Sequence, residues 1–360
     1  MNILVFGNGS LSVAQQERKL CVEFAKKGHT VHLLTTESNK LFNVGKLPKH
    51  DNLIIYDLPY GQYRYDFLPV PDDIDVALGM DQSVSQFVVE YKKRTGKRAY
   101  CMFLDFPVHV IDSGGSDYNF DYSQRYYYWI MCGLELDGII FNNTVAVEEF
   151  YKRYKKESHL VWYAVSNDDC YENYAGTEDW ENWSKDHAQG DYIAGLNRII
   201  KYKGVHHMME ALKYLDYDYL HGFVSGDPKY MEEVYSAAKK LPQNVTFFEK
   251  NGEIEKMRLL YGAKVVVYPQ ITEWIGGMSI IEAWSVKTPG VCFDYPVLKE
   301  LYGDCALYAK PGDPISLADK VNTLMTDNDM NLEMARNGYD RFKKHFTKEV
   351  MAQNILEVIL

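Results

Sequence analysis

Short runs of apolar, often β-branched residues alternate with longer amphipathic stretches along the chain, beginning with residues 2–6. Such runs are typical of strands that are buried on both faces of a parallel sheet. The first amphipathic stretch, 11–27, has apolar residues at helical spacing and is followed by Gly28, a common end signal of a helix. This alternation predicts parallel α/β sheets, because helices join consecutive parallel strands. The predicted strands are 2–6, 30–35, 52–56, 76–78, 99–104, 138–141, 160–165, 192–195, 220–225, 245–248, 265–268 and 290–293.

The alternation is interrupted between residues 166 and 191, where acidic residues and turn residues gather without a clear period. We interpret this stretch as a connection between two domains, or as an excursion beside one of them. The predicted domains are residues 1–165 and 166–343, followed by a C-terminal helix in 344–360. In the second half we expect helices at 205–215, 230–240, 254–261 and 279–286, and two helices in 330–360 that are separated near Phe346 and Thr347.

Composition and charge narrow the class of protein. The chain has 360 residues, of which 46% are apolar and 25% charged, as in an ordinary globular protein of about two domains. The net charge of −11 argues against bulk attraction to nucleic acid or anionic lipid. The six cysteines lack the spacing of a metal site or a redox pair, so we expect reduced thiols. Because the N-terminus begins with a strand and no run of about 18 apolar residues occurs, we expect a cytoplasmic protein.

Two basic runs stand out against this acidic background. Lys92–Arg98 has five basic residues and Lys152–Lys156 has four, and both fall in the first predicted domain. One interpretation is a surface for an anionic acceptor, either lipid-linked at the inner face of a membrane or the phosphate backbone of a nucleic acid. The other is the solvated end of a helix, which is the commoner role of such runs.

A glycine-rich turn, Gly7-Asn8-Gly9-Ser10, follows the first predicted strand. Backbone N–H groups at such a turn, together with the following helix, suit a phosphate, so Gly9 and Ser10 are candidate ligand contacts. As a dinucleotide fingerprint the turn is incomplete, since Ser12 occupies the third glycine position. Glu37, after the second strand, is suitably placed to hold a ribose. A nicotinamide-dependent oxidoreductase that uses Gly7, Gly9 and Glu37 is therefore one alternative.

The second half carries two further polar constellations, each after a predicted strand. Arg198 and Lys203 follow the strand 192–195, and a guanidinium with an ammonium near a helix start suits a diphosphate. Their other interpretation is a pair of solvated surface cations. After the strand 265–268, Glu273 precedes Gly276 and Gly277, whose bare backbone allows a ligand to approach. A helix start follows with Met278, Ser279, Ile280 and Glu282, where Glu282 is suited either to ribose hydroxyls or to the positive end of the helix.

In this order, these motifs resemble those of the retaining GT-B glycosyltransferases of family 4. The resemblance covers residues 192–360 well and 1–165 loosely. It rests on Arg198 with Lys203-Gly204, Val224-Ser225-Gly226-Asp227, residues 245–248, Glu273 with Glu282, Thr288-Pro289-Gly290-Val291, Pro311-Gly312-Asp313-Pro314 and Phe346-Thr347. It implies a GT-B fold, in which two Rossmann-like parallel-sheet domains face each other across a cleft and a C-terminal helix crosses back to the first domain.

The resemblance also implies an activity: retaining, metal-independent transfer of a sugar from a UDP- or GDP-linked donor to an acceptor hydroxyl, with no cofactor. Arg198 and Lys203 would neutralise the diphosphate, Glu282 would hold the ribose and Glu273 a sugar hydroxyl. The backbone from Gly276 to Ile280 would cradle phosphate and sugar. One departure concerns spacing, since one residue more than in the family separates Glu273 from Glu282. Either the loop absorbs the extra residue as a bulge, or Trp274 takes the place of Glu273.

In the first domain, the family usually has a polar residue near the donor sugar after a central strand. Asp105 aligns with that position and His109 follows four residues later, so both are candidate contacts to sugar or acceptor. Equally, Asp105 could cap a turn and His109 lie in a connecting loop. The chain has 29 tyrosines, and those in predicted first-domain loops suggest an acceptor surface, because tyrosine combines a flat apolar ring with a polar tip. These are Tyr60, Tyr63, Tyr65, Tyr118, Tyr122, Tyr126, Tyr127 and Tyr128.

Two further points bound the functional hypothesis. Asp216-Tyr217-Asp218 imitates the metal-binding Asp-x-Asp of the other glycosyltransferase fold, but its place between a helix and a strand predicts a turn, so we expect no metal. The altered glutamate spacing leaves a catalytically inactive nucleotide-sugar-binding protein as a second alternative. The identity of the sugar, of the base and of the acceptor, and the oligomeric state, stay open.

Overall fold

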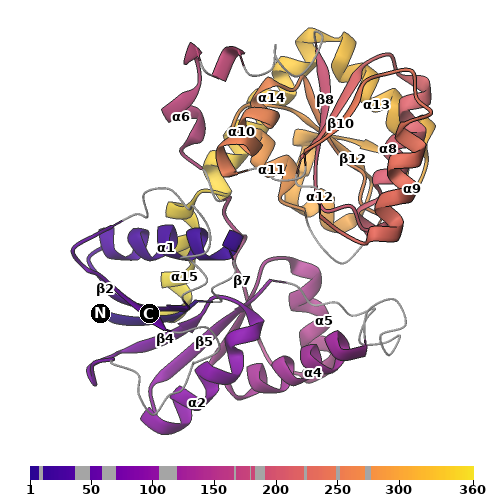
Figure 1. The fold of residues 1–360 in the computed structure, drawn as a ribbon. Coiled ribbons are helices and arrows are strands. Elements are labelled where there is room, and N and C mark those ends of the chain that lie inside the picture. The colour runs from indigo at the N-terminus through magenta and orange to yellow at the C-terminus, as the bar shows by residue number, and fades with distance from the viewer. Residues whose placement is uncertain are drawn as a thin grey trace. The chain divides into compact units, whose positions relative to one another are not determined.

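The computed structural model describes residues 1–7, 11–36, 49–58, 70–104, 120–165, 168–178, 180–182, 191–222, 225–248, 252–271 and 277–360. The chain divides into two compact units, which we describe separately (Figure 1). The first unit is Met1–Ser166 together with Thr347–Leu360, and the second is Asn167–Phe346.

The first unit contains a parallel sheet of seven strands in the order β3-β2-β1-β4-β5-β6-β7. The strands are β1 Asn2–Phe6, β2 Thr30–Thr36, β3 Leu53–Leu58, β4 Val76–Gly79, β5 Arg98–Phe103, β6 Gly138–Phe141 and β7 His159–Leu160. Val5 of β1 pairs with Leu33 of β2 on one side and Leu78 of β4 on the other. The predicted strand 160–165 was too long, because pairing with β6 ends at Leu160.

Helices connect these strands, and one comes from the end of the chain. The helical segments are α1 Leu11–Lys26, η3 Gln82–Val84, α2 Ser85–Thr95, α4 Phe120–Glu135, α5 Thr144–Tyr154 and α15 Lys348–Ile359. The C-terminal helix α15, drawn in yellow, lies beside α1 (Figure 1). Met351 and Ile355 of α15 share a buried cluster with Leu20 and Phe24 of α1. Burial of this apolar face holds the last residues of the chain in the first domain, as the resemblance implied.

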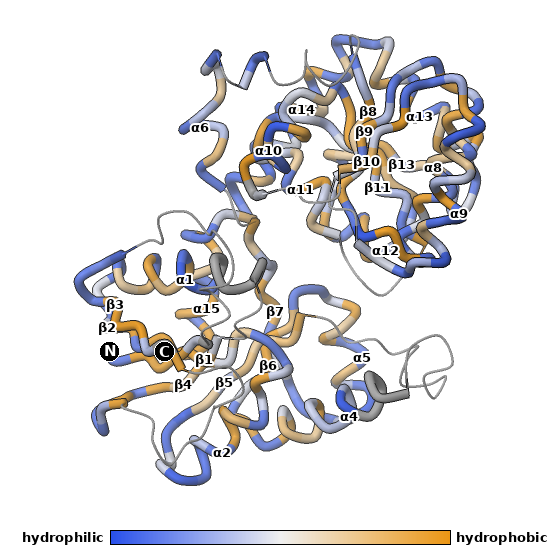
Figure 2. Tube along the Cα trace, viewed as in Figure 1, coloured by the Kyte–Doolittle hydropathy of each residue, from blue (hydrophilic) through white to orange (hydrophobic). Residues whose placement is uncertain are grey.

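The second unit contains a parallel sheet of six strands in the order β10-β9-β8-β11-β12-β13. The strands are β8 Tyr192–Leu196, β9 Asp218–Gly222, β10 Val245–Phe247, β11 Val265–Tyr268, β12 Gly290–Phe293 and β13 Ala306–Ala309. The helical segments are α6 Cys170–Tyr174, η4 Lys201–Lys203, α8 Val205–Ala211, η5 Leu212–Tyr214, α9 Pro228–Ala238, α10 Glu253–Gly262, α11 Ser279–Trp284, α12 Pro296–Tyr302, η6 Gly303–Cys305, α13 Pro314–Thr326 and α14 Asn328–His345. Hydrophobic residues concentrate in the strands of both units (Figure 2). The apolar pattern located all of these strands approximately except β13, which it did not identify.

The acidic stretch between the two sheets is more than a connection. Cys170 and Trp180 are buried in a core cluster of the second unit, where Trp180 stacks on Tyr174 with ring centroids 5.5 Å apart. Glu172 accepts a hydrogen bond of 2.8 Å from the Tyr339 hydroxyl on α14. These contacts fit the second interpretation of the stretch, an excursion beside one domain, better than a bare connection.

All six cysteines are unpaired, and five of them are buried. Among the helices that the structure describes, none combines the length and apolarity needed to cross a membrane.

Candidate active site

The second sheet has a topological switch point between β8 and β11. Successive strands run outward from β8 through β9 to β10, and from β11 through β12 to β13. In open parallel sheets, ligands bind outside the carboxyl ends of the strands at such a point. Asn197 and Arg198 follow β8 there, while Pro269 and Gln270 follow β11.

A tight turn brings Lys203 to this place. Gly204 has a φ of 69°, the left-handed conformation that favours glycine. A Cβ on Gly204 would lie 1.9 Å from the carbonyl oxygen of Pro269. Only glycine therefore allows the two backbone segments to lie this close. The Ile271 N–H also donates to the Tyr202 carbonyl over 3.0 Å. The turn therefore fixes Lys203 beside the end of β11.

The Lys203 ammonium is held by neutral polar groups. Its Nζ donates to the Tyr268 hydroxyl over 2.6 Å and to Gln270 Oε1 over 2.8 Å. It also lies over the rings of Tyr202 and Tyr268, 5.3 and 5.1 Å from their centroids. Tyr268 and Gln270 are buried and bonded to each other. Within the described part of the chain, no carboxylate contacts this ammonium.

Burial and the neighbouring positive charge of Arg198 lower the pKa of Lys203 to about 7. Arg198 itself is exposed, and its Nη2 donates to the Tyr202 hydroxyl over 3.3 Å. The two cations predicted from the sequence are thus brought together, and each is bonded to neutral side chains here. An anion that binds beside both would restore the charged form of Lys203. The exposed Arg198 fits the interpretation as a solvated cation, whereas Lys203, which is only partly exposed and bonded to Tyr268 and Gln270, does not.

Gly277 packs directly on the same tyrosine. A Cβ at this position would lie 2.0 Å from Cζ of Tyr268, and the Tyr302 hydroxyl donates to the Gly277 carbonyl over 2.6 Å. The predicted ligand contacts Ser279 and Ile280 are buried, and the Ser279 hydroxyl donates to the Leu196 carbonyl. These two side chains join α11 to the sheet, so at Ser279 and Ile280 only backbone groups could meet a ligand. Met278 is partly exposed.

Glu282 lies near the start of α11, where the sequence predicted a ribose contact. Its Oε1 is 2.8 Å from Nζ of Lys256 on α10, and the two side chains are only 14% and 10% exposed. Lys256 was missed by sequence reasoning, because a lysine in an amphipathic helix is usually a surface residue. Gln270, Tyr268 and Tyr202 were missed as well, and the position of Gln270 at a strand end was the one available signal.

Several predicted site residues lie outside the described residues: Gly9, Ser10, Glu37, Asp105, His109, Glu273, Trp274 and Gly276. Their roles remain predictions. The same holds for Tyr60, Tyr63, Tyr65 and Tyr118, and for the side chain of Tyr122. Tyr126 to Tyr128 were expected in a loop, but they belong to α4. Tyr126 is fully buried, which excludes it from an acceptor surface, while Tyr127 and Tyr128 are 54% and 52% exposed.

Gly7 is explained by packing within the first domain. Its N–H donates to the Leu34 carbonyl over 2.9 Å, and a Cβ here would lie 2.5 Å from Oε2 of Glu17. The glycine therefore allows the buried Glu17 side chain to approach the end of β1. Because the Gly7 N–H is already bonded, a nucleotide phosphate is not needed to account for this glycine.

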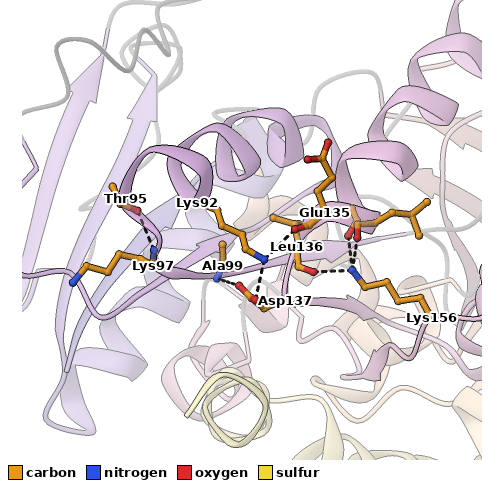
Figure 3. Close-up of polar contacts among 10 residues, drawn as sticks. Lys92, Thr95, Lys97, Ala99, Glu135, Leu136, Asp137 and Lys156 are labelled. Carbon is orange, nitrogen blue, oxygen red and sulfur yellow. Dashed lines mark hydrogen bonds and ion pairs between the residues drawn. The ribbon is translucent and has the colours of Figure 1, made fainter.

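Two lysines of the basic runs bind the C-terminal end of a helix of the same domain. Figure 3 shows the ammonium groups of Lys92 and Lys156 at the C-terminal end of α4. Lys92 Nζ donates to the Glu135 carbonyl over 3.0 Å and to Asp137 Oδ1 over 2.9 Å. Lys156 Nζ donates to the carbonyls of Leu134 and Leu136 over 2.6 and 2.7 Å. These contacts favour the helix-end interpretation over a membrane or nucleic-acid surface.

Similar intramolecular pairing extends to other members of the runs. Lys93 is 2.5 Å from Glu135, Arg94 is 2.5 Å from Glu90, and Lys152 is 3.2 Å from Glu149. In the Asp-x-Asp sequence, Asp218 belongs to β9, and its carboxylate accepts from the Asn244 N–H over 3.1 Å. Within the described ranges, no three His, Cys, Asp or Glu side chains gather as metal ligands.

Comparison with known proteins agrees with this architecture. The fold of two parallel-sheet α/β domains is that of GT-B glycosyltransferases. Over 99% of its length the chain matches Anabaena Alr3699/HepE in complex with UDP and glucose, with 15% identity, a TM-score of 0.76 and 99% of that chain covered. Sucrose-phosphate synthase from Thermosynechococcus elongatus matches over 99% of this chain and 98% of its own, with 15% identity and a TM-score of 0.72. A glycosyltransferase from Rickettsia africae matches over 99% and 97%, with 15% identity and a TM-score of 0.71.

The family comparison concerns the second domain. Residues 179–341 match the family model described as "Glycosyl transferases group 1". The resemblance inferred from Arg198, Lys203 and the motifs that follow them is thereby confirmed: this part of the second domain is similar to group 1 glycosyltransferases, and the fold is GT-B. No curated protein sequence matches the chain.

Proposed function

We propose that this protein is a retaining, metal-independent glycosyltransferase that moves a sugar from a nucleoside-diphosphate sugar, UDP- or GDP-linked, to an acceptor hydroxyl. The observation that carries the proposal is the environment of Lys203. Its ammonium is bonded to Tyr268 and Gln270 at the switch point of the sheet, beside Arg198. Among the residues that the structure describes, only neutral side chains bond this partly buried cation. Such a cation favours an anionic ligand, and a diphosphate supplies one.

A structural relative supports the binding of a nucleotide sugar. One structure is described as Anabaena Alr3699/HepE with UDP-glucose, and it shares the fold with a TM-score of 0.76. In this protein, Arg198 and Lys203 would hold the diphosphate and Glu282 the ribose. Glu273, Gly276, Asp105 and His109 keep their predicted roles at the sugar and the acceptor. The acceptor is a glycan, a lipid-linked hydroxyl or another hydroxyl compound.

The chemistry follows from the charge that develops at the diphosphate. As the bond from the anomeric carbon to the diphosphate oxygen breaks, negative charge grows on that oxygen. Fixed cations at Arg198 and Lys203 stabilise this charge more in the transition state than in the bound donor. The acceptor oxygen bonds to the anomeric carbon from the same face, and its proton passes to the leaving diphosphate. The configuration is thereby retained.

A donor panel and three variants test the proposal. Purified protein is heated with UDP-, GDP-, ADP- and dTDP-sugars, and the preferred donor raises the melting temperature because it binds the folded state. Arg198→Ala and Lys203→Met abolish donor binding and transfer while the fold survives. Lys201→Met, an exposed neighbour in η4, serves as the matched control and retains both. Full activity of the Lys203 variant would overturn the assignment.

Further measurements separate the finer points and the alternatives. Proton NMR of the first product formed reports whether the anomeric configuration is retained, and transfer in the presence of EDTA reports whether a metal is needed. Tight NAD binding would favour the oxidoreductase alternative. Donor binding without transfer or hydrolysis would favour the inactive binding protein.

A further inference from the structure

Asn197 carries a buried carboxamide without a hydrogen-bond partner. The residue is 7% exposed, and neither Oδ1 nor Nδ2 is bonded in the structure. Nearly all buried polar groups in folded proteins are paired, because an unpaired one loses its water without compensation. A carboxamide in which both the donor and the acceptor are unpaired therefore requires an explanation.

The backbone around Asn197 is held firmly. His221 Nε2 lies 2.9 Å from the Asn197 carbonyl oxygen, and His221 Nδ1 lies 2.7 Å from the Tyr219 hydroxyl. Burial lowers the pKa of His221 to about 4, so the ring is neutral and Nε2 donates while Nδ1 accepts. On the other side, the Leu196 carbonyl accepts from the Ser279 hydroxyl. The position of Asn197 is thus fixed by groups that leave its side-chain amide unused.

The place of the amide points to a ligand. Asn197 lies at the carboxyl end of β8, at the switch point with β11, and directly precedes Arg198. This is the end of the sheet where Lys203 and Gln270 meet. A ligand bound to Arg198 and Lys203 would therefore lie beside the Asn197 amide, which has no hydrogen-bond partner in the described part of the protein.

We propose that the Asn197 carboxamide binds a hydroxyl group of the nucleotide-sugar donor, with Nδ2 donating to it and Oδ1 accepting from it. This inference rests on the proposed function. A phosphate oxygen only accepts, so it would leave Oδ1 unpaired, whereas a hydroxyl both donates and accepts. Both the ribose and the transferred sugar carry hydroxyls, and the experiment distinguishes them.

The test compares Asn197→Leu with wild type in two measurements on the full chain. Leucine has a similar shape and lacks the unpaired polar atoms, so the ligand-free variant melts at the same temperature as wild type or higher. Binding of UDP-glucose, measured by calorimetry, weakens about tenfold or more, the size of one or two hydrogen bonds. If the donor panel selects guanine, GDP-mannose and GDP replace UDP-glucose and UDP.

UDP alone identifies the hydroxyl, since it contains the ribose but no transferred sugar. Equal weakening for UDP and UDP-glucose assigns the contact to the ribose, and weakening for UDP-glucose only assigns it to the sugar. Asn331→Leu is the matched control, because the Asn331 Nδ2 donates to the carbonyls of Lys264 and Leu324, both over 2.9 Å. This control loses stability and retains donor affinity.

Two results overturn the inference. If Asn197→Leu binds the donor as wild type does, the amide has no role in recognition, and the proposed function stands without it. If the variant loses stability as Asn331→Leu does, the amide is structural. Failure of the wild-type protein to bind any nucleotide sugar overturns the proposed function, and the inference with it.

Discussion

Nζ of Lys256 lies 2.8 Å from Oε1 of Glu282 and joins α10 to α11. Both side chains are largely buried, so the pair is shielded from solvent and salt. The carboxylate predicted to bind a ribose is therefore held by a cation of its own domain. A ribose that bonds Glu282 would find this carboxylate already oriented.

The pair predicts a stability effect. Lys256→Met leaves the Glu282 carboxylate largely buried without this cation, so the free energy of unfolding falls by about 3 kcal/mol. Urea unfolding at neutral pH measures the change. The double variant Lys256→Met with Glu282→Leu recovers much of the loss, because no charge is left behind. Wild-type stability of the single variant would contradict a buried pair.

Lys203 predicts a dependence of stability on pH. Its pKa of about 7 in the folded protein lies below the ordinary value of 10.5. Between these values the unfolded chain holds a proton that the folded chain has released, so stability from this group rises with pH. Below pH 7 Lys203 is protonated in both the folded and the unfolded state, so the folded state bears the full cost of the buried charge. The stability of wild type relative to Lys203→Met therefore increases from pH 7 towards pH 10, as measured by urea unfolding at several pH values. A constant difference over this range would contradict the lowered pKa.

The same lysine predicts how donor binding responds to pH. A bound diphosphate favours the charged ammonium and raises the pKa of Lys203. Binding of the preferred donor therefore takes up a proton above about pH 7, and the affinity falls as the pH rises. Calorimetry in two buffers of different ionisation enthalpy measures the uptake. Lys203→Arg keeps the charge and removes the uptake, and an unchanged uptake in this variant would place the proton elsewhere.

Close packing predicts that Gly277→Ala is destabilising. The added Cβ would lie 2.0 Å from Cζ of Tyr268. The Tyr268 ring would have to move, and the Tyr268 hydroxyl would lose its hydrogen bond to Lys203. We expect a loss of about 1–3 kcal/mol in urea unfolding, together with weaker donor binding. In a double-mutant cycle with Tyr268→Leu, adding Gly277→Ala has little further effect on stability, because the ring is absent. Additive losses would show that the clash is elsewhere.

The fold followed from the sequence because its signals are local. Apolar runs identified the strands. Arg198 and Lys203 were found because they lie close together in the sequence, directly after a strand. The contacts of Lys203 could not be found in this way, since Tyr268 at the end of β11 and Gln270 just after it lie 65 and 67 residues further along the chain. A tyrosine at the end of a buried strand is expected to pack in the core. Its hydrogen bond to the Lys203 ammonium becomes visible only in the folded structure.

Asn197 and Lys256 also show that burial and distant partners cannot be inferred from local sequence. The sequence places Asn197 beside Arg198, but only the three-dimensional structure shows that its amide is buried and unpaired. Lys256 has the pattern of a surface residue, and its partner Glu282 lies 26 residues further on. The basic runs misled in the other direction, since their local charge density suggested a ligand. Two of their lysines instead pair with Asp137 and Glu135, about forty residues further along the chain.

The end of α4 supplies the last prediction. Lys156 Nζ donates to carbonyls that the helix leaves without intrahelical partners, and burial lowers the pKa of this lysine. Lys156→Met therefore lowers the free energy of unfolding by about 1–3 kcal/mol, the cost of leaving such groups unbonded. The control Lys155→Met, which loses a contact to the Tyr151 ring at 5.7 Å, costs about 1 kcal/mol or less. Urea unfolding measures both, and sedimentation with vesicles of anionic lipid tests the membrane interpretation on the same proteins. If Lys156→Met were as stable as wild type and bound such vesicles less than wild type does, this lysine would belong to a membrane surface instead of a helix end.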